Sequence, residues 1–139
     1  MNITIEGIDE SIQQNIQPAL QHLNQELNLQ LEHLSIQFIS DEELLHINKE
    51  FLNHDYYTDI ITFDLRDELS KEAELYISLD RILDNATQLE IKSETEMFRV
   101  IIHGLLHLAG YQDKNETDEA EMRLQENKYL ALLFHVKQI

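Results

Sequence analysis

The stretch that decides the fold is "SETEMFRVIIHGLLHLAG", residues 93–110. A helix over 94–109 would carry apolar side chains on nearly every face, which is typical of a buried, central helix. The segment "SETE" at 93–96 fits a capping box, in which Ser93 and Glu96 satisfy free backbone amides at the start of the helix. We therefore expect the rest of the chain to pack around this helix.

The N-terminal half predicts two strands and two helices. "NITIE" at 2–6 and "LSIQF" at 34–38 alternate apolar and polar residues, as half-buried strands do. Between them, apolar residues from Ile8 to Leu27 recur at helical spacing, and Pro18 marks either a kink or a late helix start. "SDEE" at 40–43 is a capping box that predicts a helix over 41–52.

The C-terminal half predicts a pair of strands followed by helices. "DIITFD" and "ELYISLD", around 60–64 and 74–79, are rich in β-branched and aromatic residues and are separated by a charged loop. Asp80 is suited to cap a helix through Leu89, and an amphipathic helix follows the loop at 110–116. We expect one α+β domain over 1–139: a small mixed four-stranded β-sheet packed with about five helices, with a metal site on the central helix and following loop.

Composition restricts the class of protein. The chain has 139 residues, 42% of them hydrophobic, which suits one globular domain. It lacks cysteine, so a metal would have to be held by imidazole and carboxylate groups. No apolar run is long enough to span a bilayer and the N-terminus lacks the features of a signal peptide, so we expect a cytoplasmic protein without a membrane partner.

The charge of the chain is strongly acidic. A net charge of −17, from 27 acidic and 10 basic residues, repels polyanions and argues against nonspecific nucleic-acid binding. Solubility alone is a sufficient explanation for such a charge.

Spacing within the central helix predicts a metal site. His103 and His107 are four residues apart, so both imidazoles can converge on one ion at roughly 2.0–2.1 Å. Gly110 can adopt the left-handed conformation that ends a helix, which lets Asp113 return toward the same ion. Three protein ligands with a fourth position open to water are typical of catalytic zinc, which lowers the pKa of its water to about 7.

Other interpretations of this segment stay open. Two histidines at this spacing also occur by chance, as hydrogen-bonded core or surface residues. Gly104 occupies the position of the general base in the H-E-x-x-H helix of zinc proteases, so that machinery is incomplete. This glycine indicates either a close ligand or tight packing against a strand. Two histidines and a carboxylate are also the ligands of non-haem iron sites.

The segment "HGLLHLAGYQD" at 103–113 resembles the signature H-G-x-L-H-L-x-G-Y-D-H of the YbeY-like endoribonucleases, also called rRNA maturation factors. "TDIITF" at 58–63 is similar to the T-D-V-L-S-F-like strand of that family, and the resemblance covers nearly the whole chain. It implies a single-strand-specific, metal-dependent endoribonuclease of ribosomal RNA maturation and ribosome quality control. The resemblance also implies one zinc on His103 and His107. This chain has Asp113 at the position of the third histidine of the family signature. Gln112 and Asp118 are alternative candidates for the third ligand, but only Asp113 aligns with that position.

A second departure concerns RNA binding. The family usually has a basic residue where this chain has Leu52, so a phosphate contact is missing. His54 and Arg66 are weak candidates for catalytic or phosphate-contacting residues, and Lys49 is a further candidate for a phosphate contact. Three tyrosines could stack on bases: Tyr56, Tyr57 and Tyr111. The expected partners are ribosomal RNA, presented on ribosomal particles, and a ribosomal or assembly-factor protein; DNA is not expected.

Two alternative functions remain. The chain could be a non-catalytic ribosome assembly factor with a structural metal, which a closed fourth coordination position would favour. It could also be a metallohydrolase of another substrate class, which a carboxylate near the open position would favour.

Overall fold

The computed structural model describes residues 1–137, with side chains described through Leu133. The last two residues of the predicted domain, 1–139, lie outside this range. No described helix is long and apolar enough to cross a membrane.

Nine elements follow one another along the described chain: β1 (Asn2–Glu6), α1 (Glu10–Glu26), β2 (His33–Ile39), α2 (Asp41–Leu52), β3 (Ile60–Asp64), β4 (Glu72–Ser78), α3 (Leu79–Leu89), α4 (Ser93–Leu108) and α5 (Glu116–Lys137). The sheet order is β1-β2-β4-β3; β1, β2 and β4 are parallel, and β3 is antiparallel to β4. The predicted α+β fold with a small mixed four-stranded sheet is therefore confirmed.

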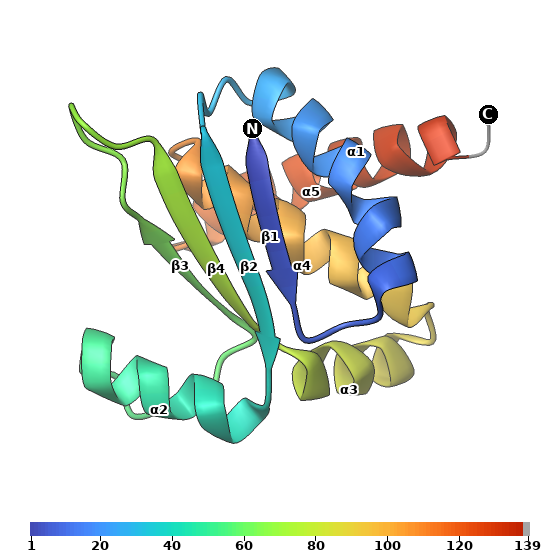
Figure 1. The fold of residues 1–139 in the computed structure, drawn as a ribbon. Coiled ribbons are helices and arrows are strands. Elements are labelled where there is room, and N and C mark those ends of the chain that lie inside the picture. Colours follow the sequence, from blue (N-terminus) through green and yellow to red (C-terminus); the bar gives the residue numbers. More distant parts are fainter. Residues whose placement is uncertain (138–139) are drawn as a thin grey trace.

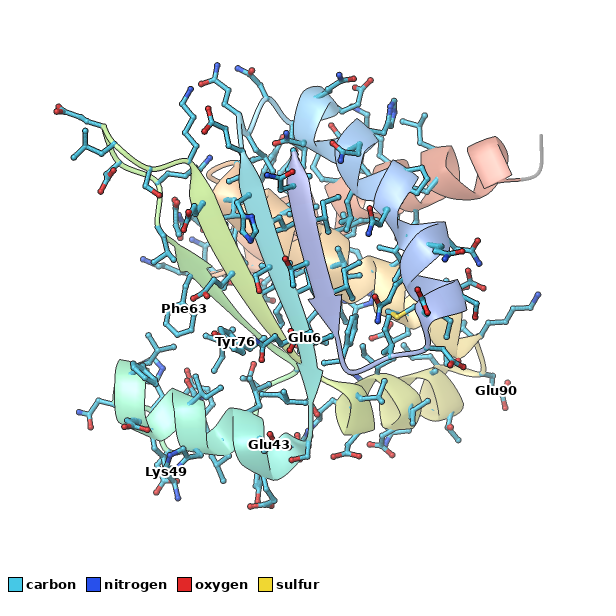
Figure 2. The ribbon with its side chains drawn as sticks, in the orientation of Figure 1. Glu6, Glu43, Lys49, Phe63, Tyr76 and Glu90 are labelled. Carbon is cyan, nitrogen blue, oxygen red and sulfur yellow. The ribbon has the colours of Figure 1, made fainter. Side chains whose placement is uncertain are left out.

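The two faces of the sheet differ. Alternate residues of β2, namely Leu34, Ile36 and Phe38, are buried on the face that α1, α4 and α5 cover (Figure 1). On the other face, α2 packs at the β3 end, where the ring of Phe51 contacts that of Phe63 at a centroid distance of 6.2 Å. Figure 2 shows Phe63 and Tyr76 on this second face, toward α2. The core thus lies on one side of the sheet.

Helix α4 is the central element, as its all-round apolarity predicts. Val100, Ile101, Ile102 and Leu106 are fully buried. A Cβ added to Gly104 would lie 2.7 Å from Cδ1 of Ile60 and 3.2 Å from Oγ1 of Thr62, so a larger residue here would have to displace side chains of β3. Of the two interpretations of this glycine, the structure supports packing against a strand. The close approach places the histidines of α4 beside β3.

The two predicted capping boxes have different outcomes. At α2, the Ser40 hydroxyl accepts from the amide of Glu43 at 3.1 Å and the Glu43 carboxylate accepts from the Ser40 amide, as predicted. At α4 the prediction is wrong: Ser93 already lies inside the helix, and the preceding residue makes no side-chain cap. Glu96 instead turns inward, where it accepts from Arg99 at 2.7 Å.

Two further helix starts differ from the sequence analysis. Asp80 does not cap α3; the Ser78 hydroxyl accepts from the amide of Arg81, and the Asp80 carboxylate accepts from the amide of Asp41 at the start of α2. The tertiary contact thus takes the carboxylate away from its own helix. In α1, the predicted alternative of a late helix start at Pro18 is wrong, because the helix begins at Glu10 and continues through Pro18.

Candidate metal centre

The C-terminal end of α4 and the turn after it bring three possible ligands together. The Nε2 atoms of His103 and His107 lie 3.1 Å apart, and Oδ2 of Asp113 lies 3.3 and 3.4 Å from them. Gly110, with a φ of +102°, reverses the chain between helix and carboxylate. All three predicted residues therefore meet in one group that could hold a metal ion.

Hydrogen bonds to the opposite ring nitrogens orient both imidazoles. The backbone carbonyl of Tyr111 lies 3.0 Å from Nδ1 of His107, and a carboxylate oxygen of Glu126 lies 2.8 Å from Nδ1 of His103. A carbonyl and a carboxylate can only accept, so each Nδ1 donates and each neutral ring keeps its lone pair on Nε2. Two lone pairs and a carboxylate that face one another at this distance repel unless a cation lies between them. The donor set fits a metal such as zinc, which binds imidazole and carboxylate.

Glu126 is a residue of the candidate site that the sequence analysis missed. It lies on α5, is 2% exposed, and also accepts from Arg99 at 3.0 Å. Burial raises the pKa of Glu126, but the bonds from His103 and Arg99 outweigh it, so the net pKa is lowered and the group stays a carboxylate. Glu126 follows Met122 by four residues on the apolar side of its helix, and an acid in that place is the signal that could have revealed it.

Arg99 connects this carboxylate to a second buried acid. Its guanidinium donates to Glu96, which is fully buried, as well as to Glu126, and lies 4.0 Å from Asp59. The bond to Glu96 is the main reason that the pKa of Arg99 is raised, with burial acting against it and Glu126 adding to it. One buried cation therefore joins two buried acids behind the histidines.

The same surroundings favour the protonated form of His103 when no metal is bound. Burial lowers the pKa of His103, but the hydrogen bond and charge of Glu126, together with the charges of Asp59 and Asp113, raise it further than burial lowers it. A metal ion would replace this proton between the same groups.

An open cleft of about 520 Å³ lies beside the three candidate ligands. It is lined by the ligands themselves, by β3 and the residues before it, and by the loop after α2. Leu52 and His54 line it, and the His54 ring stacks on Tyr56 at a centroid distance of 5.1 Å. Among the described residues that line the cleft there is no lysine or arginine.

The other predicted RNA contacts lie elsewhere. Arg66 donates to Asp64 and to the carbonyls of Leu29 and Leu108, so it holds the end of α4. Lys49 lies on α2 (Figure 2) and pairs with Asp55 at 3.2 Å.

The three tyrosines also separate. Tyr57 donates to Glu42, Tyr111 packs against the core, and Tyr56 lines the cleft. Of the predicted RNA contacts, His54 and Tyr56 therefore line the cleft beside the candidate ligands.

Comparisons with known proteins match most of the described chain. The family model described as "Endoribonuclease YbeY" matches residues 2–133. A Porphyromonas gingivalis protein named endoribonuclease YbeY is 51% identical over 100 residues, which are 72% of this chain and 66% of that protein. A Chloroherpeton thalassium protein of the same name is 40% identical over 123 residues, 88% of this chain and 87% of that one. The solution structure of a Thermotoga maritima protein aligns with a TM-score of 0.71 and 27% identity, covering 98% of this chain and 91% of the other.

Proposed function

This chain belongs to the YbeY family, and from that membership and its candidate metal centre we propose that it is a zinc-dependent endoribonuclease of single-stranded RNA, acting in ribosomal RNA maturation and ribosome quality control. The observation that carries the proposal is the orientation of the two imidazoles. Both Nδ1 atoms are engaged, so both Nε2 lone pairs and the Asp113 carboxylate are directed at one point.

We propose His103, His107 and Asp113 as the ligands. Bound zinc would supply a Lewis acid beside a scissile phosphate. Glu126 and the Tyr111 carbonyl would keep the imidazoles in place, because a histidine ligand held through its other nitrogen is fixed in tautomer and direction. Asp113 makes the donor set more negative than three histidines would, which weakens the electrophilicity of the ion.

The open cleft supports catalysis over a purely structural metal. A structural zinc site is closed by a fourth protein ligand, whereas the described group contains three candidate ligands next to a cleft. Within this cleft, the stacked rings of His54 and Tyr56 offer a surface for an unpaired base. Asp59 lies at the same cleft as a carboxylate outside the ligand set, and is our candidate for accepting a proton during cleavage. Such a carboxylate also suits a metallohydrolase of another substrate class, so the choice of RNA as substrate rests on the family membership.

Free RNA should bind weakly. The described lining of the cleft lacks lysine and arginine, Leu52 occupies the usual basic position, and the chain carries −17 charges. Since cations on the protein drive most nucleic-acid affinity, we propose that docking to a protein on the ribosomal particle supplies the remainder.

The test is cleavage of one RNA, offered free and on ribosomal particles. We expect weak, chelator-sensitive cleavage of free RNA and faster cleavage on particles. His103→Ala should abolish both, whereas the exposed His46→Ala should behave as wild type. Cleavage that survives chelation and His103→Ala would come from a contaminating nuclease. Absence of cleavage on both substrates would favour the non-catalytic assembly factor.

A further inference from the structure

Strand β3 has an unpaired edge. It is one of the two outermost strands of the sheet, the other being β1, and it pairs with β4 alone (Figure 1). Hydrogen bonds at the two ends of this ladder show which residues of β3 bond to β4. The Ser78 amide donates to the Asp59 carbonyl at 2.9 Å, and the Leu65 amide donates to the Glu72 carbonyl at 3.1 Å. Bonded and outward-facing residues alternate in an antiparallel pair. The amides and carbonyls of residues 60, 62 and 64 therefore face away from the sheet.

This edge forms a wall of the metal cleft. Ile60, Thr62 and Asp64 line the cleft together with His103 and His107. Within the described residues, one contact reaches an outward backbone group: the Thr58 hydroxyl, 3.4 Å from the Ile60 carbonyl. Thr62, in the middle of the strand, lines the cleft, and its outward amide and carbonyl have no hydrogen-bond partner among the described residues. Proteins usually cover or block such an edge, because it is a template for another strand.

We propose that the β3 edge binds an extended, lysine- or arginine-rich segment of a partner protein as a fifth strand. The outward amide and carbonyl of Thr62 would pair with the backbone of that segment. Side chains of an added strand alternate between two faces. One set would face α4 and Asp113, and the other would face the side of the sheet on which Leu52 and Tyr56 line the cleft.

Charge selects a basic peptide over RNA for this edge. Asp59, Asp64 and Asp113 line the cleft, and the described lining contains no lysine or arginine. Asp64 is already paired with Arg66 and Asp113 is a proposed metal ligand, so the charge argument rests on Asp59, on the absence of cations from the described lining and on the net charge of −17. A phosphodiester laid along β3 would bring anions to these carboxylates, whereas a peptide backbone is neutral and basic side chains are attracted to them. A bound segment would also cover the metal ligands, so it would compete with RNA for the cleft and regulate cleavage.

Thr62→Pro tests the edge directly. Proline removes the outward amide and places its ring where the added strand would bind, while the bonds to β4 from residues 61 and 63 remain. The probe is a labelled peptide of alternating lysine and valine, measured by fluorescence anisotropy without RNA, with zinc-loaded and with chelated protein. We expect Thr62→Pro to weaken binding at least about fivefold, because the lost hydrogen bond contributes about 1 kcal/mol, where 1.4 kcal/mol would be tenfold, and the proline ring adds a steric block. The control Thr62→Val, which keeps the amide, should bind as wild type does.

A second arm leaves the protein unchanged. A peptide N-methylated at alternate residues, on the amides that would face β3, should lose binding to wild type, and a glutamate–valine peptide should not bind. Equal binding to wild type and Thr62→Pro, or of the methylated and unmethylated peptides, would overturn the proposal. The proposal would also be overturned if Thr62→Pro lost RNA binding but kept peptide binding, because that result would assign the edge to RNA. Because peptide binding is measured without RNA, it can succeed or fail independently of nuclease activity.

Discussion

The starts of α2 and α4 carry the same pattern, Ser-x-x-Glu, and use it differently. At α2 the pattern lies in solvent, and Ser40 and Glu43 cap the helix with each other. At α4 the glutamate is fully buried and bonded to Arg99, which in turn holds Glu126 against His103. An exposed glutamate binds the nearest free amide, whereas a buried one must have a charged partner. The same Ser-x-x-Glu pattern therefore makes a helix cap in one place and a support of the candidate metal centre in the other.

The largest expected effect comes from breaking the buried network. Arg99→Met would leave Glu96 and Glu126 without their shared cation, and we expect a loss of about 3–5 kcal/mol in the free energy of unfolding. Arg81→Met is the matched change near α2, where the Arg81–Asp41 pair is more exposed, and it should cost less than about 1 kcal/mol. Urea unfolding of both variants checks this; equal losses would contradict the role of burial.

The second largest effect should be a difference in zinc affinity between substitutions of Glu126 and of Glu43. Glu126→Gln keeps an acceptor but loses the charge that holds His103, so we expect zinc affinity to fall about 10–100-fold. Glu43→Gln, on the exposed cap, should leave the affinity unchanged. Titration of zinc against a competing chelator measures both. Unchanged affinity in Glu126→Gln would mean that this carboxylate does not support the centre.

The serines give a smaller difference. Ser40→Ala removes a hydroxyl that accepts from a helix amide and should cost about 1 kcal/mol of unfolding free energy. Ser93→Ala should cost less than about 0.5 kcal/mol, since Ser93 caps nothing. Thermal and urea unfolding of the two variants compare them, and a larger loss for Ser93→Ala would contradict the assignment of the caps.

The pair of the exposed Asp64 and the partly buried Arg66 should give the smallest effect. The hydrogen bond from Arg66 is the main reason that the pKa of Asp64 is lowered. Because the folded pKa is depressed, the contribution of the pair is complete above the ordinary value of 3.8 and is lost as pH falls through the lower, folded value. Asp64→Asn should therefore be slightly less stable than wild type near neutral pH, by less than about 1 kcal/mol. Unfolding measured across pH should show this difference vanish in acid; a difference that grows in acid would contradict the sign.

Hydrophobic periodicity and capping patterns predicted which helices and strands form better than they predicted how the helices begin. The apolar faces of α4 placed it at the centre, and the alternation in the strands predicted the sheet. The start of α3 was mispredicted because Asp80 bonds to the amide of Asp41, 39 residues away in sequence. Such a contact leaves no local pattern.

The candidate site divides in the same way. The sequence by itself determined that His103, His107 and Asp113 would meet, because helical periodicity and the turn at Gly110 place them within one short segment. Only the tertiary structure decided that Glu126 would hold His103, that Arg99 would join two buried acids, and that the free edge of β3 would line the cleft. These groups come from separate elements, and packing of α4 against α5 and β3 is what brings them together.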